Sequence, residues 1–178
     1  LDFDALYSPA WDPTGRRIAF SGIRGGKSDL WAVDVETGEL EQLTDDPYLA
    51  RDPQWSPDGG RIAFVTDRGP DTDLEHLIFG ESKIAILDVA RRSVDVLPGQ
   101  SGKDISPQWG PDGKSLAFVS DRDGISDLYI QDLETERLSR LTKLVTGVTG
   151  LVESSPPFSW SRDGKRIVFT TFMGDGWE

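Results

Sequence analysis

Acidic side chains and a single histidine make up most of the groups in this chain that could do chemistry. One segment carries Asp71, Asp73, Glu75 and Glu81 around His76, the only histidine. Such carboxylates could bind a hard cation, but their spacing matches no defined cation-binding loop. A lone histidine beside an apolar run is more often packed or hydrogen-bonded than a metal ligand. These residues therefore predict a polar loop without an assigned metal.

Two further segments look like ligand loops at first. Residues 121–127 read Asp-Arg-Asp-Gly-Ile-Ser-Asp and superficially resemble a calcium loop. The related segment at residues 22–28 lacks these carboxylates, so the better interpretation is a hairpin turn. That second segment is a near miss for a phosphate-binding loop, since Ser21 stands where the motif needs glycine. It also lies between two expected strands and not before a helix.

The sequence offers no paired nucleophile and base. It contains no Gly-x-Ser-x-Gly elbow, no cysteine and only one histidine. A self-contained catalytic triad is therefore not expected, and disulfides and thiolate metal sites are excluded. We predict that the chain is not an enzyme and carries no cofactor.

Charge and hydropathy narrow the class of partner. The chain has 31 acidic and 19 basic side chains, a net charge of −12. An anionic surface repels phosphate backbones, so nucleic acid is not the expected partner. No apolar run approaches the roughly 20 residues of a membrane span. A protein or peptide partner of unknown identity is the remaining expectation.

Four near-copies of one motif must position these loops. Each copy has a tryptophan, a turn rich in glycine and aspartate, and an apolar run ending in phenylalanine. The tryptophans are Trp11, Trp55, Trp109 and Trp160, and the phenylalanines are Phe20, Phe64, Phe118 and Phe169. The tryptophans are 44, 54 and 51 residues apart, and a period of that size is typical of a repeat architecture. We expect all four tryptophans to pack in the core, filling the gap to an adjacent unit.

Each copy reads as four short antiparallel strands. In the third copy these strands are expected at residues 107–109, 116–119, 127–132 and 138–142. The Gly110-Pro-Asp-Gly113 segment between the first two favours a type I turn. Asp112 and its equivalents Asp58 and Asp163 are expected to accept hydrogen bonds within their turns. Four such strands make one propeller blade.

The sequence therefore predicts an all-β fold, a β-propeller segment of about three and a half four-stranded antiparallel blades. The expected bounds within residues 1–178 are 7–44 for blade 1, 52–98 for blade 2, 106–142 for blade 3 and 157–172 for half of blade 4. A closed ring typically needs four to eight blades. We expect a segment excised from a longer protein, with a homodimer that completes the ring as the other possibility. Open faces around Ile18-Ala-Phe20 and Ile167-Val-Phe169 are then expected to be exposed.

Two segments depart from the repeat. Blade 2 has a long insertion at residues 67–82, and the connection at residues 143–156 is also lengthened. In an up-and-down blade both emerge at the same end, where binding usually sits on a regular scaffold. The alternative is neutral surface decoration. The candidate binding face comprises Asp67, Arg68, Asp71, Asp73, Glu75, His76, Asp121, Arg122 and Asp123.

The motifs resemble the WD-like propeller repeat of the TolB family. The string Pro-x-Trp-Ser-Pro-Asp-Gly-x-x-Ile-Ala-Phe-Val-Ser/Thr-Asp-Arg ends at Arg68 in blade 2 and, almost intact, at Arg122 in blade 3. It is followed by Asp127-Leu-Tyr129 and Arg140-Leu-Thr142. The resemblance implies a bacterial propeller, periplasmic or secreted, that binds other proteins. No functional residue carries over from it.

Related repeats form the non-catalytic propellers of prolyl oligopeptidase-type and tricorn-type proteases. The resemblance therefore also allows an accessory propeller of a larger peptidase whose catalytic domain is absent from this chain. A propeller enzyme of the oligogalacturonate lyase kind would need a cluster of histidine and glutamine ligands. His76 alone argues against that third possibility.

Overall fold

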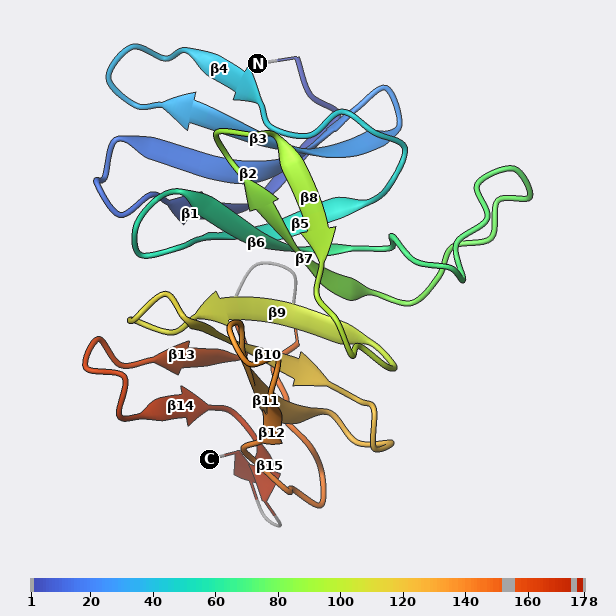
Figure 1. The fold of residues 1–178 in the computed structure, drawn as a ribbon, viewed down its shortest axis with the longest axis vertical. Helices are drawn as coiled ribbons and strands as arrows, with labels where there is room; N and C mark the ends of the chain where they lie inside the picture. The colour runs from blue at the N-terminus through green and yellow to red at the C-terminus, as the bar shows by residue number, and fades with distance from the viewer. Residues whose placement is uncertain (1, 152–155, 174–175, 178) are drawn as a thin grey trace.

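The computed structural model describes residues 2–151, 156–173 and 176–177, and in these residues the chain is built from strands without a helix. Three four-stranded antiparallel sheets stack face to face, followed by two short strand pairs (Figure 1). Blade 1 consists of β1 (Ala5–Trp11), β2 (Arg17–Arg24), β3 (Lys27–Asp34) and β4 (Leu40–Gln42). Blade 2 consists of β5 (Ala50–Trp55), β6 (Arg61–Thr66), β7 (Lys83–Asp88) and β8 (Ser93–Val96).

Blade 3 consists of β9 (Asp104–Trp109), β10 (Ser115–Ser120), β11 (Asp127–Asp132) and β12 (Leu138–Arg140). Half of a fourth blade follows as β13 (Phe158–Trp160) and β14 (Ile167–Phe169), and then β15 (Phe172–Met173) pairs with β16 (Gly176–Trp177). Strands pair with their sequence neighbours in every blade, as expected for hairpin connections. The predicted fold class, a propeller segment of about three and a half blades, is confirmed.

The innermost strand of each complete blade carries a bulge that the sequence analysis missed. Ser8, Asp52 and Ser106 have φ angles of 53°, 54° and 55°, and the strand register shifts around each. A proline follows each of them and has no N–H to give to the ladder, which suits a bulged position. The Ser-Pro or Asp-Pro pair that precedes Trp11, Trp55 and Trp109 was the available signal.

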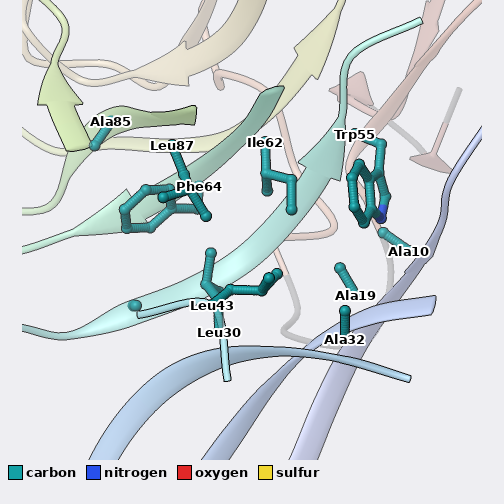
Figure 2. Close-up of a cluster of buried hydrophobic side chains, with 11 residues drawn as sticks. Ala10, Ala19, Leu30, Ala32, Leu43, Trp55, Ile62, Phe64, Ala85 and Leu87 are labelled. Atoms are coloured by element: carbon teal, nitrogen blue, oxygen red, sulfur yellow. The ribbon is translucent and has the colours of Figure 1, made fainter. Parts of the chain in front are cut away.

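Tryptophan holds blades 1 and 2 together. The Trp55 indole is buried against Ala10, Ala19 and Ala32 of blade 1 (Figure 2). The Arg17 guanidinium carbon lies 5.3 Å from the indole centroid, a cation–π contact. Three small alanines thus leave the space that one large ring of the next blade fills.

Blades 2 and 3 repeat this arrangement. Trp109 is 8% exposed, packs in one cluster with Ala63, and lies 4.6 Å from the Arg61 guanidinium carbon. Its Nε1 also donates a hydrogen bond of 2.9 Å to the Gln54 carbonyl. Trp160 is partly buried against the corresponding cluster of blade 3. Core packing is therefore confirmed for Trp55 and Trp109.

The same prediction is wrong for Trp11, which is 59% exposed. Trp55 and Trp109 each pack against the blade that precedes them in the sequence. Among the described residues, no blade precedes Trp11, so its ring has no sheet to lie against. The repeat sequence therefore specifies where the ring points, and the neighbouring blade determines whether it is buried.

The expectation of an exposed Ile18-Ala-Phe20 face is also largely wrong. Phe3 covers Phe20 and Trp31 in edge-on contacts with centroid distances of 5.7 and 5.0 Å. Phe20 is consequently buried, whereas Ala19 is buried on the opposite face of the strand, in the cluster around Trp55. At the other end, Val168 in the half-blade is 72% exposed, as expected for a sheet face without a neighbour.

An aspartate at the start of the third strand locks the outer hairpin in blades 1 and 3. Thr142 Oγ1 donates to Asp127 and accepts from the Leu128 N–H at 3.0 Å, while Arg140 also donates to Asp127. Thr44 Oγ1 makes the equivalent bond to Asp29 at 2.9 Å. These contacts explain why Asp-Leu-Tyr/Trp and Leu-Thr recur together in the repeat.

The two aspartates, Asp29 and Asp127, differ in their electrostatic surroundings. Burial raises the pKa of Asp29, the Thr44 bond only partly offsets it, and the nearby carboxylates of Asp45 and Asp46 raise it further. Burial also opposes ionisation of Asp127, but the hydrogen bonds from Thr142 and Arg140 outweigh it, so this pKa is lowered. Gln42 occupies the register position in blade 1 that Arg140 occupies in blade 3.

The aspartates of the inner turns have the predicted local role. Asp58 accepts from Ser56 Oγ and the Gly60 N–H, at 2.5 and 3.0 Å. Asp112 accepts from the Lys114 N–H, and Asp163 accepts from the Lys165 N–H. The Gly113 N–H donates to the Gly110 carbonyl at 2.9 Å, which closes the predicted turn.

Candidate binding surface

The loops predicted to bind lie at one end of the stack. The insertion at residues 67–82, between β6 and β7, projects well beyond the sheets on the same side as the β10–β11 turn (Figure 1). The Asp104 N–H donates to the Ser82 carbonyl at 2.9 Å, and the Val148 N–H donates to the Ser126 carbonyl at 2.6 Å. The described part of the second lengthened connection therefore packs at this end too, while residues 152–155 lie outside the described ranges.

Asp67 and Arg68 have structural contacts. Asp67 is buried and accepts a hydrogen bond of 2.8 Å from the Leu49 N–H. The Arg68 guanidinium pairs with Asp46 and donates to Thr66 Oγ1 at 2.7 Å. Both side chains therefore fasten the connection between blades 1 and 2 to blade 2 itself.

Asp121 and Arg122 repeat these contacts in blade 3. Asp121 accepts from the Lys103 N–H at 2.8 Å, and Arg122 donates to both oxygens of Asp104 at 3.2 and 3.1 Å. Asp104 is fully buried, and burial raises its pKa although hydrogen bonds from Ser120 and Arg122 act in the opposite direction. A motif repeated in both blades could have indicated this shared structural role.

Asp123 is held by two partners. The Tyr129 hydroxyl donates to it at 2.6 Å, and Arg140 forms an ion pair with it at 3.0 Å. Burial and then the bond to Asp123 raise the pKa of Tyr129 to about 12, so the phenol remains a hydrogen-bond donor. Asp121, Arg122 and Asp123 thus make most of their contacts within blade 3 and its incoming connection.

The outer part of the blade 2 insertion is a small hairpin. Asp73 and Ile78 exchange two backbone hydrogen bonds, both of 2.8 Å. Asp73 Oδ1 accepts from the N–H groups of Glu75 and His76, and His76 Nδ1 lies 2.8 Å from Asp73 Oδ2. The hydrogen bond from the His76 ring is the main cause that lowers the pKa of Asp73. The histidine is hydrogen-bonded, in line with the interpretation of its sequence context.

The base of the insertion is also closed by local bonds. The Thr72 hydroxyl donates to the Asp67 carbonyl and accepts from the Gly80 N–H. Asp71 accepts from the Glu81 N–H at 3.1 Å, which lowers its pKa. A Cβ on Gly80 would lie 2.7 Å from Asp71 Cγ and 2.8 Å from Thr72 Oγ1, so a larger residue here would have to displace these two side chains.

Asp71 and Asp73 accept hydrogen bonds from backbone N–H groups of the insertion itself. Across residues 2–151, 156–173 and 176–177, no group of three or more His, Cys, Asp or Glu side chains is placed to hold a metal ion. In the same described part of the chain, no helix is long and apolar enough to cross a membrane.

Three exposed apolar residues of the insertion, at and beside the Asp73–Ile78 bridge, were not predicted as part of the binding surface. Leu77, Ile78 and Phe79 are 73%, 55% and 65% exposed. Leu77 adopts φ 55°, a backbone conformation that is uncommon for a residue other than glycine or asparagine. Three consecutive large apolar residues inside a polar insertion were the signal that could have identified them.

Stacked four-stranded antiparallel blades with loops gathered at one end define this chain as a β-propeller protein. A family model described as the TolB beta propeller domain matches residues 73–175, more than half of the chain. The chain therefore belongs to the TolB β-propeller domain family.

The individual proteins similar to this chain include a peptidase and TolB proteins. An uncharacterized peptidase, YuxL of Bacillus subtilis, is 40% identical over 75 residues, which cover 42% of this chain and 10% of YuxL. The Tol-Pal system protein TolB of Hahella chejuensis is 40% identical over 67 residues, which cover 35% of this chain and 15% of that protein. The crystal structure of TolB from Acinetobacter baumannii superposes with a TM-score of 0.79 at 27% identity, covering 98% of this chain and 40% of that one. The chain therefore spans well under half the length of each of these proteins.

Proposed function

We propose that this chain is a non-catalytic propeller scaffold that binds another protein, in the manner of TolB-like proteins, in the bacterial periplasm or outside the cell. The observation that carries the proposal is the blade 2 insertion. It projects from an otherwise regular stack as a hydrogen-bonded hairpin with exposed side chains. Long, ordered loops on a rigid scaffold are common sites of recognition. Similarity to a Tol-Pal system protein supports an interaction role.

The proposal can be tested by capture followed by reconstitution. The immobilised chain is incubated with a periplasmic extract, captured proteins are identified, and each is purified and titrated against the free chain. We expect at least one purified protein to bind with a Kd at or below about 10 μM. Failure of every purified candidate to bind would contradict the scaffold function.

A second candidate function is the accessory propeller of a larger peptidase. The similarity to the peptidase YuxL specifically favours it. In that case this chain would position or restrict peptide substrates for a catalytic domain elsewhere in the protein. The gene region on either side of this segment provides the test. An adjoining hydrolase domain with a Gly-x-Ser-x-Gly elbow would support the peptidase, and flanks without any hydrolase or zinc motif would contradict it.

We also propose that the open blade faces associate with a second copy of the chain. Leu6 and Trp11 are exposed on one outer face, and Val168 is exposed on the other. Unpartnered apolar sheet faces favour association, and a two-fold dimer would cover them. Light scattering after size exclusion is expected to give about twice the chain mass of 19.6 kDa. A monodisperse monomer at micromolar concentration would exclude this assembly.

A further inference from the structure

We propose that Leu77, Ile78 and Phe79 form an anchor that packs on an apolar surface bordered by basic side chains on a partner protein. This inference rests on the proposed scaffold function and names the partner chemistry that the insertion fits. These three residues form the apolar tip of the insertion.

The apolar tip has the exposure of a binding element and not of a core segment. All three side chains are more than half exposed, and they are consecutive in the chain. Single exposed apolar residues are normal on protein surfaces, but a contiguous cluster on a projecting loop usually marks an interaction site. Aromatic and branched aliphatic anchors of this kind carry much of the affinity of protein interfaces.

The backbone holds the apolar tip in a fixed shape before a partner arrives. The Asp73–Ile78 bonds, the Asp73 cap and the close packing at Gly80 enclose it on both sides. Leu77 keeps a left-handed backbone that asparagine would adopt more readily. Because the hairpin is already ordered, binding loses less conformational entropy than it would with a floppy loop.

Charge selects the class of partner. Residues 69–82 contain four carboxylates, Asp71, Asp73, Glu75 and Glu81, and no lysine or arginine. The N–H groups that bond to Asp71 and Asp73 do not neutralise their charge. Lysine or arginine side chains around an apolar surface on the partner would complement these four negative charges. An anionic lipid surface would be repelled by the same carboxylates, so a protein is favoured over a membrane.

A pair of synthetic peptides tests the inference directly. The probe is a labelled amphipathic helix of about 14 residues made of leucine and lysine, and its twin has glutamate in place of lysine. We expect fluorescence anisotropy to show that the chain binds the leucine–lysine peptide at least about tenfold more tightly than the twin. Binding is also expected to weaken in about 0.5 M salt, because exposed charges are then screened.

The decisive variant is Leu77→Asn with Phe79→Ser. Asparagine tolerates the left-handed backbone at position 77, so the hairpin is expected to remain ordered. The matched control is Val145→Ser, which removes an exposed apolar side chain elsewhere at the same end of the stack. The double variant should lose about tenfold or more in affinity for the leucine–lysine peptide, while the control should bind like the parent chain.

Two results would overturn the inference: equal peptide binding by the parent and the double variant, or tip-dependent binding to phosphatidylcholine vesicles without binding to the peptide. The scaffold function is judged separately with the purified partner from the capture experiment. If that partner binds the double variant as tightly as the parent, the scaffold function stands and the tip assignment fails. If the partner binds the parent and Val145→Ser but not the double variant, both stand.

Discussion

Blades 1 and 3 share one repeat, the same strand order and the same register, yet equivalent residues behave differently in them. Trp109 is 8% exposed and Trp11 is 59% exposed. Asp127 is paired with Arg140, whereas its equivalent Asp29 faces Gln42. The repeat therefore determines the strand order of each blade. How much an equivalent residue stabilises the fold depends on the adjacent blade and on the charges near it.

The largest expected contrast concerns the two tryptophans. Trp109→Ala removes a large side chain from between blades and deletes its bond to Gln54, so the free energy of unfolding should fall by about 3–5 kcal/mol. Trp11→Ala removes a largely solvated ring and should cost less than about 1 kcal/mol. Urea unfolding of both variants measures the contrast. Similar losses for the two would show that burial between blades does not decide the role of this residue.

A smaller contrast in the free energy of unfolding is expected between substitutions of Asp127 and Asp29. Asp127→Asn weakens a charge-assisted network and should cost about 1–3 kcal/mol near neutral pH. Because the folded pKa of Asp127 is lowered, its stabilisation is present above the unfolded value of about 3.9 and is lost as pH falls through the folded pKa. Urea titrations at about pH 7 and about pH 3 should therefore show that the deficit of the variant shrinks in acid. A deficit that is unchanged at low pH would argue against this electrostatic account.

The Asp29→Asn substitution should change the free energy of unfolding in the opposite direction. The folded pKa of Asp29 is raised, so ionisation costs stability as pH rises from the unfolded pKa through the folded one. Asparagine avoids this cost and can still accept the hydrogen bond from Thr44. We expect the variant to match or exceed the parent by up to about 1 kcal/mol at neutral pH. Destabilisation as large as that of Asp127→Asn would show that Arg140 is not the source of the difference.

The sequence was sufficient for everything that depends on the repeat alone. The strand order and the aspartate turns follow from local patterns that recur in each copy, and the stacking of successive copies buries Trp55 and Trp109. The sequence did not predict the exposure of Trp11 or the burial of Phe20, because both depend on tertiary context: no blade precedes Trp11 among the described residues, and Phe3 covers Phe20. In the candidate surface, Asp67, Arg68, Asp121 and Arg122 were selected because they lie in loops at one end of the stack. The recurrence of the Asp-Arg pair indicates a structural role, but the connecting segments that each pair contacts could not be read from spacing.

The smallest effect on stability is expected from replacing the whole insertion with the turn of blade 3. Thr66 pairs with Lys83 in the same way that Ser120 pairs with Asp127, so the turn at residues 121–126 fits the same two strands. The graft keeps the Asp-Arg pair, and its terminal serine carbonyl takes the place of Ser82. The unfolding free energy should stay within about 1 kcal/mol of the parent.

The affinity of this graft for the leucine–lysine peptide tests most directly whether the repeats build the stack and the insertion binds. A folded graft with a parental melting transition is expected to lose at least about tenfold in affinity. A folded graft that binds the peptide as tightly as the parent chain would contradict the account, because recognition would then lie in the blades.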